Sequence, residues 1–402
     1  MCSSDLNMQA LADGHVMVNL TGRDEILVVD GYTMLEEARI ASSGIGGTRP
    51  VHSYITPDRD LWLTLNDGSE GEGNTAAFVD LRNGAATRFE IVGEVELGVG
   101  HHKATFSRTM DRVVISNIGD CDDALSVYDY SDLGDVRLLA TLSGADAGFD
   151  GDDPGGGNFD PTYCDPTYER GLPPAPHGCA TASNGRAYCN LTSSGDIVVV
   201  DLDADEPTFS LIGTGGSGGG KTDVHPAGRY VYSLQESPRG GCGIGQLVVI
   251  DSRTDSVVSE VPLGYYGPGC DEDLAGTDAE TANPDHLTFT HDGDTLYVGV
   301  AGGFEVADAR VDQHVVVDTR DPADPVQLES LPMGVSTGHS DDALSGDGRL
   351  LVCVDSVDNS LTLVDAAACD RLGTITTGDN PKAVATFGSK EVPSEQTGPF
   401  TE

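Results

Sequence analysis

Six histidines recur at related positions along the chain, which has 402 residues and only 10 His in total. Each lies seven to nine residues before the Gly of a hairpin-turn signal or its equivalent: His52, His101, His102, His177, His286 and His339. Three of the four lysines occupy the same level, Lys103 and Lys221 directly and Lys382 through alignment of NPKAVA with NPDHLT. Because the spacing follows a repeat, these side chains are expected to converge in the fold.

Three kinds of site remain open for this set. Imidazoles that converge from several directions suit a borderline or soft metal ion, with copper the first candidate and zinc the second. Protonated histidines beside the three lysines would instead attract an anion. In the third interpretation the side chains form a structural hub that bonds only water and carbonyl groups. A regular strand cannot point offsets of seven, eight and nine to one side, so only some of the six are expected to be ligands.

The remaining four histidines fall at turns or strand starts elsewhere in the repeat. We interpret them as surface residues: His15, His225, His291 and His314.

The elements that position these residues are seven copies of one unit. A short β-rich run ending in Asp recurs as EILVVD, TAAFVD, LSVYD, DIVVVD, QLVVID, QHVVVD and SLTLVD. A strand–turn–strand signal such as TASNGRAYCN precedes each run, and a polar turn with a fourth strand follows it. Four strands in roughly 50 residues, without helical periodicity, predict one blade of a β-propeller. The fold class is therefore all-β, a seven-bladed β-propeller of four-stranded antiparallel blades.

The predicted propeller is a single domain over residues 7–388, followed by a polar tail over 389–402. Residues 1–6, MCSSDL, match the translation of a common sequencing-adapter end and are expected to be an artefact, with a native signal peptide lost upstream. An additional truncated blade upstream stays open. The expected blades are roughly 7–42, 51–93, 101–142, 177–212, 221–262, 285–331 and 338–376, with a closing strand at 380–388.

The cysteines follow the same repeat. Two pairs lie in equivalent loops of the third and fifth blades and predict disulfides, Cys121 with Cys164 and Cys242 with Cys270. Cys179 and Cys189 flank a hairpin turn and predict a third disulfide. Cys353 with Cys369 is the weakest prediction, because it only pairs the two cysteines that are left over. Free buried thiols are the alternative. Oxidised pairs favour a periplasmic or extracellular protein.

Charge excludes one class of partner. The 66 acidic residues against 22 basic ones give a net charge of −44, which is incompatible with an electrostatic nucleic-acid binder. No apolar run approaches the ~20 residues of a membrane span. The Asp-rich inserts FDGDDPGGGNFD and CDEDLAGTDAE contain oxygen ligands suited to calcium, without EF-hand spacing. GGSGGGKT fits a phosphate-loop pattern, but Pro226 and Gly228 forbid the helix that such a loop requires.

The blade pattern, with its Asp-Gly turns, YV strands and closing Asp, resembles the YVTN family of propellers over roughly residues 7–388. This resemblance implies the fold and little about function, because propellers host many activities. The segments GHHKATFS and PAPHGCATASNGR further resemble channel-entry segments of the nitrous oxide reductase propeller. That likeness implies copper ligation by His101, His102 and His177, with Lys nearby. His52, His286 and His339 match only in residue type and in their position near the start of the inner strand. The cupredoxin domain of those enzymes has no counterpart here, so a copper-bearing hub is implied and nitrous oxide reduction is not.

Together these observations predict an exported propeller that binds a metal, copper first and zinc or calcium as alternatives, at a His- and Lys-lined channel mouth. A redox role, and whether the protein is an enzyme at all, stay open. One alternative is a ligand- or protein-binding module with a structural hub. Another is a lactonase-type hydrolase, for which the sequence shows no convincing carboxylate and Arg constellation. The expected partners are a small-molecule or anionic ligand at the mouth and a protein on the insert-bearing face.

Overall fold

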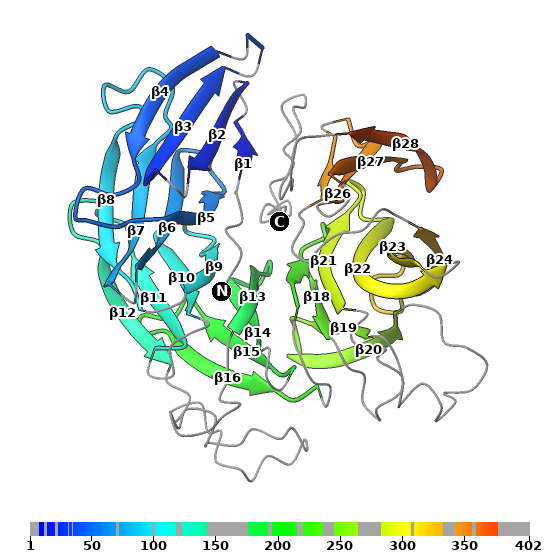
Figure 1. The fold of residues 1–402 in the computed structure, drawn as a ribbon. Coiled ribbons are helices and arrows are strands. Elements are labelled where there is room, and N and C mark those ends of the chain that lie inside the picture. The colour runs from blue at the N-terminus through cyan, green and yellow to red at the C-terminus, as the bar shows by residue number, and fades with distance from the viewer. Residues whose placement is uncertain are drawn as a thin grey trace.

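The computed structural model describes most of the chain, and its described residues form 28 β-strands and no helix. These strands make seven four-stranded antiparallel sheets, numbered here as blades 1 to 7 in chain order. The blades surround a common centre, with the first strand of a blade innermost and the fourth outermost (Figure 1). The predicted seven-bladed β-propeller is confirmed. The described residues are 8–11, 14–20, 23–30, 32–33, 35–69, 72–98, 101–117, 123–142, 176–191, 195–214, 220–235, 245–263, 283–306, 309–332, 342–345, 347–355 and 359–376.

Each blade contains its four strands in chain order, from the inner to the outer edge. The strands are β1 (Met8–Ala10), β2 (His15–Leu20), β3 (Glu25–Asp30), β4 (Leu35–Ala41); β5 (Pro50–Ile55), β6 (Leu61–Ser69), β7 (Glu72–Asp80), β8 (Ile91–Glu96); β9 (His101–Phe106), β10 (Arg112–Asn117), β11 (Leu125–Asp129), β12 (Arg137–Leu142); β13 (Pro176–Thr181), β14 (Arg186–Leu191), β15 (Ile197–Asp201), β16 (Thr208–Ile212); β17 (Thr222–Val224), β18 (Tyr230–Gln235), β19 (Gln246–Asp251), β20 (Ser256–Pro262); β21 (Asn283–Phe289), β22 (Thr295–Val306), β23 (Ala309–Asp318), β24 (Val326–Pro332); β25 (Ala343–Leu344), β26 (Leu350–Asp355), β27 (Ser360–Asp365) and β28 (Asp370–Thr376).

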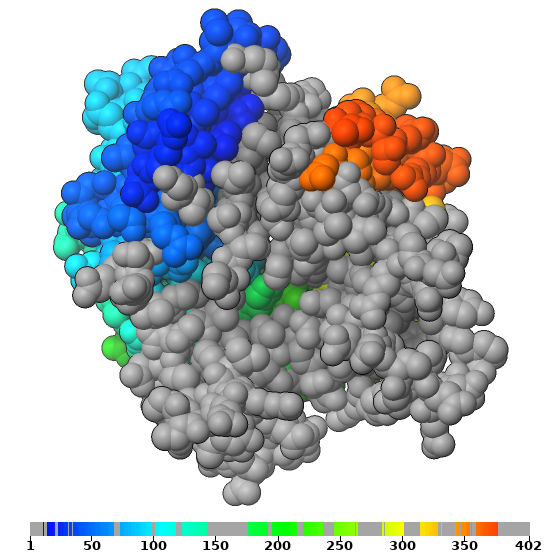
Figure 2. Space-filling model, viewed as in Figure 1, coloured from blue at the N-terminus to red at the C-terminus, as the bar shows by residue number. Residues whose placement is uncertain are grey.

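Blade 1 and blade 7 lie on either side of the same end of the molecule, as the blue and orange surfaces of the space-filling view show (Figure 2). The closing strand predicted at 380–388, the tail at 389–402 and residues 1–6 lie outside the described residues. Within the part of the chain that the structure describes, no helix has the length and apolarity to cross a membrane.

The recurring Asp ends the third strand of every blade, and its carboxylate caps the turn that follows. In blade 2, for example, Oδ1 of Asp80 accepts the backbone N–H of Arg82 at 2.9 Å. Such side-chain bonds to a backbone N–H two residues on form an Asx-type turn, which explains why Asp recurs there. The seven carboxylates that accept such a bond belong to Asp30, Asp80, Asp129, Asp201, Asp251, Asp318 and Asp365.

The tyrosine of the second strand links one blade to the next. The hydroxyl of Tyr232 in blade 5 donates to the carbonyl of Pro322 in blade 6, at 2.8 Å. Tyr297 in blade 6 likewise donates to the carbonyl of Ala366 in blade 7, at 2.9 Å. Each acceptor lies in the turn between the third and fourth strands. The tyrosine of the repeat therefore fixes the position of neighbouring blades relative to each other.

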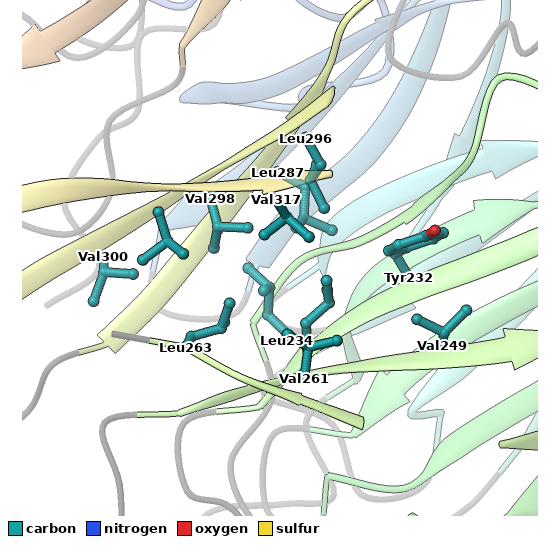
Figure 3. Packing of buried hydrophobic residues seen from close by; sticks show 12 residues of the cluster. Tyr232, Leu234, Val249, Val261, Leu263, Leu287, Leu296, Val298, Val300 and Val317 are labelled. Atoms are coloured by element: carbon teal, nitrogen blue, oxygen red, sulfur yellow. The ribbon is translucent and has the colours of Figure 1, made fainter. Parts of the chain in front are cut away.

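Apolar side chains fill the space between neighbouring blades. One cluster joins Tyr232, Leu234 and Val249 of blade 5 to Leu296 and Val298 of blade 6, and all of these are fully buried (Figure 3). Central strands are covered on both faces by adjacent blades, so all six residues of β19 are buried. The continuous apolar runs of the repeat reflect this two-sided burial.

Candidate metal centre

Two histidines and one aspartate meet at the junction of blades 6 and 7. His286 lies on β21, His314 on β23, and Asp342 directly precedes β25. The Nε2 atom of His286 lies 2.8 Å from Oδ2 of Asp342, and Nε2 of His314 bonds to the same oxygen. All three residues are buried. Since an ionised carboxylate only accepts hydrogen bonds, each imidazole donates an Nε2–H to Asp342.

Gly299 on β22 makes this arrangement sterically possible. It is paired with His286 on one side and with His314 on the other, so it lies between them in the sheet. A Cβ atom at Gly299 would lie 2.2 Å from Nε2 of His286, far inside van der Waals contact. The missing side chain provides the space that the imidazole of His286 occupies.

The donor set fits a divalent transition metal. One ligand atom each from His286, His314 and Asp342 can be chosen so that all lie within 4.8 Å of one another. Among the described residues, this is the one group of three or more His, Cys, Asp or Glu side chains with that geometry. Two imidazole nitrogens and a carboxylate oxygen are a ligand set of zinc and related ions, whose bonds to them are about 2.0–2.2 Å.

The electrostatics of the site keep Asp342 ionised. Burial alone would raise the pKa of its carboxyl group, but His286 and His314 hold that pKa well below its usual range. The carboxylate is therefore available as a metal ligand across the pH range in which imidazoles become deprotonated.

A buried thiol lies beside this carboxylate. Burial raises the pKa of Cys353, and the carboxylates of Asp342 and Asp355 raise it further. The thiol also hydrogen-bonds to the side chain of Asp342. Cys353 and Cys369 are both free, so the pairing predicted between them is wrong. Instead, Sγ of Cys369 lies 3.3 Å from the hydroxyl of Tyr297.

Only one member of this group lies at a position that the repeat predicts. His286 was predicted as a ligand, whereas His314 was interpreted as a surface residue and Asp342 was not singled out. The sequence carried a usable signal for His314, since it directly precedes the apolar run Val315, Val316 and Val317, which is buried on both faces of β23. No repeat position marks Asp342, because it precedes a short inner strand whose equivalents elsewhere are not acidic.

The surface interpretation was also wrong for His225. This residue is buried, its Nε2 lies 2.9 Å from the carbonyl oxygen of Gly293, and its Nδ1 accepts the N–H of Ala227 at 3.1 Å. Burial lowers the pKa of its imidazole. His225 therefore acts as a neutral link between blades 5 and 6.

Three other predicted histidines form a row on the inner strands of blades 2, 3 and 4. The ring centroids of His52 and His102 lie 4.4 Å apart, with the rings nearly perpendicular at 78°. Those of His102 and His177 lie 4.3 Å apart, tilted by 34°. We call these three residues the histidine row. The sequence window thus brought together side chains from three blades that are in contact in the fold.

A β-bulge accompanies the predicted histidines on each inner strand where they occur within the described residues. The pairing of the inner strand with its neighbour shifts by one residue at Pro50/His52, at His101/Ala104, at Pro176/Cys179 and at Pro284/His286. A bulge inserts one residue and re-aims the side chains around it. This extra residue explains how different offsets from the turn still bring side chains together.

His101, Lys103 and Lys221 lie on or directly before the inner strands of blades 3 and 5. His101 is buried, and burial lowers the pKa of its imidazole to about 4. Lys103 follows His102 on β9 and its backbone N–H donates to Oγ of Ser116 at 2.9 Å. Lys221 is buried next to β13, since a Cβ atom at Gly178 would lie 2.9 Å from its Cα.

Several predicted residues lie outside the described part of the chain, and their roles stay predictions. They are His339, Lys382, Cys121, Cys164, Cys242 and Cys270. The Asp-rich inserts considered for calcium lie outside it too.

The disulfide between Cys179 and Cys189 is present. The two residues are directly opposite each other on β13 and β14. The cross-link therefore closes the β13–β14 hairpin, which carries His177.

Comparison with known proteins gives the fold. No protein-family model and no curated protein sequence matches this chain. The periplasmic gluconolactonase of Pseudomonas aeruginosa is similar in structure, with a TM-score of 0.62 and 14% identity, over 91% of this chain and 97% of that one. A putative 6-phosphogluconolactonase of Bacteroides fragilis gives 0.60 and 12%, over 95% and 97%. A Lactobacillus plantarum protein gives 0.58 and 14%, over 89% and 93%. At these identities the likeness is one of fold alone.

Proposed function

We propose that this protein is an exported β-propeller that binds one divalent transition metal ion through His286, His314 and Asp342. The observation that carries the proposal is the convergence of two imidazoles and one carboxylate oxygen on a single buried point. A metal ion bound to Nε2 of both neutral imidazoles, each with its proton on Nδ1, would take the place of the two hydrogen bonds to Asp342 and would offset the charge of the carboxylate.

Copper remains the first candidate for the ion. Sites built from nitrogen and oxygen donors bind Cu²⁺ more tightly than Zn²⁺ or the earlier divalent ions. A bound ion would act as a Lewis acid, and it would also tie blade 7 to blade 6 because its ligands come from both.

Elemental analysis of the purified full-length chain, loaded with copper or with zinc and then desalted, tests the proposal. We expect about one equivalent of metal per chain, and a fall below about 0.2 in Asp342→Asn and in His314→Gln, because each removes one of three ligands. His291→Gln, which changes a half-buried histidine in the β21–β22 turn, is the matched control and should retain the metal. Wild type below about 0.2 equivalents with both metals, or full loading of Asp342→Asn, would overturn the proposal.

Export is supported by the Cys179–Cys189 disulfide, because disulfides persist mainly in oxidising compartments. One structural neighbour is a periplasmic gluconolactonase. Fractionation of a cell that produces the protein from its native gene should place it outside the cytoplasm; a cytoplasmic protein with reduced cysteines would contradict this part.

A lactonase activity is the second candidate, suggested by two structural neighbours, a gluconolactonase and a putative 6-phosphogluconolactonase. An assay of lactone hydrolysis on metal-loaded and metal-stripped protein separates the two candidates. Hydrolysis by both preparations would support a metal-independent hydrolase, whereas inactivity of both leaves metal binding as the function.

A further inference from the structure

We propose that the histidine row, His52, His102 and His177, forms a second site that binds a small oxyanion such as phosphate or a carboxylate. This site goes beyond the proposed metal centre and shares no residue with it. The row joins the inner strands of three successive blades through two ring contacts with centroids 4.4 and 4.3 Å apart.

The charge of the strands that carry the row favours an anion. Acidic residues outnumber basic ones by 66 to 22 in the whole chain. Yet β5, β9 and β13, with sequences PVHSYI, HHKATF and PHGCAT, contain four histidines, one lysine and no acid. Lys103 is the permanent cation on these strands, and His52, His102 and His177 add positive charge when protonated. Positive charge at one place in a strongly negative protein concentrates anions there.

The groups around the row support the same conclusion. Lys103 follows His102 on β9. Lys221 directly precedes β17, and its Cα would lie 2.9 Å from a Cβ atom at Gly178, the residue after His177 on β13. Asp223 on β17 is the one acidic group on the described inner strands of blades 2 to 5. A lysine beside the row adds positive charge, which helps to bind an anion and opposes the binding of a cation.

The arrangement of the rings argues against one shared metal ion. Among the described residues, three ligand atoms lie within 4.8 Å of one another at His286, His314 and Asp342. The histidine row does not form such a group. His102 instead contacts one neighbour on each side. A row of ring N–H donors can bond different oxygens of one oxyanion, and such bonds are strong when the imidazoles are protonated.

Burial and backbone geometry indicate a prepared site. His52 is buried, whereas His102 and His177 are partly exposed, so the row is held at one end and accessible along the rest. All three strands bulge where the histidines occur. Bulges that re-aim side chains are typical of the surroundings of functional sites.

The test is a titration of the full-length chain, labelled with ¹⁵N in its histidines, at pH 6 and constant ionic strength. The probes are inorganic phosphate and, separately, acetate, which distinguish a phosphate from a carboxylate ligand. We expect saturable shifts of the imidazole resonances of His52, His102 and His177, and none for the buried His225, with at least one of the two probes. His102→Asn should weaken binding at least about tenfold, the loss of one charge-assisted hydrogen bond.

His177→Asn is a second variant, used in case His102→Asn does not fold, and His291→Asn is the control that should leave binding unchanged. Unsaturable shifts, equal shifts at His225, or unchanged affinity in both row variants would overturn the proposal. So would tight binding of added Zn²⁺ or Cu²⁺ that depends on His102 and displaces the anion, since the row would then be a metal site. Asp342→Asn should keep anion binding while it loses metal, so failure of one site is distinguishable from failure of the other.

Discussion

A Cβ atom added to Gly299 would lie 2.2 Å from the Nε2 atom of His286. Gly299→Ala should therefore force the imidazole or the strand to move and separate His286 from Asp342. We expect a loss of about 1–3 kcal/mol in the free energy of unfolding, typical of overpacking a buried site, together with loss of metal loading. Denaturant titration and elemental analysis measure the two effects.

Gly373→Ala is the matched control for Gly299→Ala. Gly373 lies on β28, and a Cβ atom there would meet nothing within 4 Å. The control should change stability by no more than about 0.5 kcal/mol, as surface substitutions usually do, and should bind metal like wild type. Normal metal loading of Gly299→Ala would show that the space beside the imidazole of His286 is not required for metal binding.

The capping carboxylate of blade 2 should make the protein sensitive to acid. The side chain of Arg82, with Thr87 and the backbone N–H of Arg82, holds the pKa of Asp80 at about 2, below its ordinary value of 3.8. Because the folded-state pKa is depressed, this stability is present above about pH 4 and is lost as pH falls toward 2. Asp80→Asn should cost about 2 kcal/mol at pH 7, with the difference from wild type vanishing near pH 2.

Removal of the guanidinium isolates the cause of that shift. In Arg82→Gln the strongest contribution to the low pKa of Asp80 is absent. Its stability should therefore decline less between pH 4 and pH 2 than that of wild type. Parallel pH profiles of the two proteins would contradict the assignment.

A second pH effect is expected from His101. Burial lowers the pKa of its imidazole to about 4, from an ordinary value of 6.5. The unfolded chain therefore binds a proton at higher pH than the folded one, so stability decreases as pH falls from 6.5 to 4. The decrease amounts to about 3 kcal/mol, and His101→Asn should abolish this part of the pH dependence. Unfolding curves at half-unit steps of pH compare the two proteins, and an NMR titration midpoint of His101 near 6.5 would contradict the prediction.

The fold was predictable because every blade repeats the same pattern of four strands and the turns between them. In all seven blades the Asp at the end of the third strand accepts a hydrogen bond from the backbone N–H two residues later, as Asp80 and Asp365 do. Because this bond joins residues only two apart, the sequence itself shows where it forms. The bulges were not predicted, but a window of three offsets was wide enough to include them, and it therefore identified His52, His102 and His177 together.

The metal centre could be predicted only in part, because it depends on contacts between elements. His314 lies on β23, the third strand of blade 6, and Asp342 directly precedes β25, the first strand of blade 7. Gly299 on β22 leaves room for the imidazole of His286. None of these positions recurs in the other blades. Neither spacing nor composition indicates that three such residues meet, so His286 was grouped with the other inner-strand histidines.

The hairpin disulfide should contribute measurably to stability. Cross-linking Cys179 to Cys189 restricts the unfolded chain, and removal of such a bond costs about 2–3 kcal/mol. Cys179→Ala with Cys189→Ala should therefore lower the free energy of unfolding by that amount, measured by denaturant titration without reductant. Wild type should approach the stability of the variant when reductant is added. A reductant response that persists in the variant would come from other disulfides, as expected if Cys121 pairs with Cys164 and Cys242 with Cys270. Equal stability of wild type and variant without reductant would show that the strand pairing of β13 and β14 already supplies the constraint.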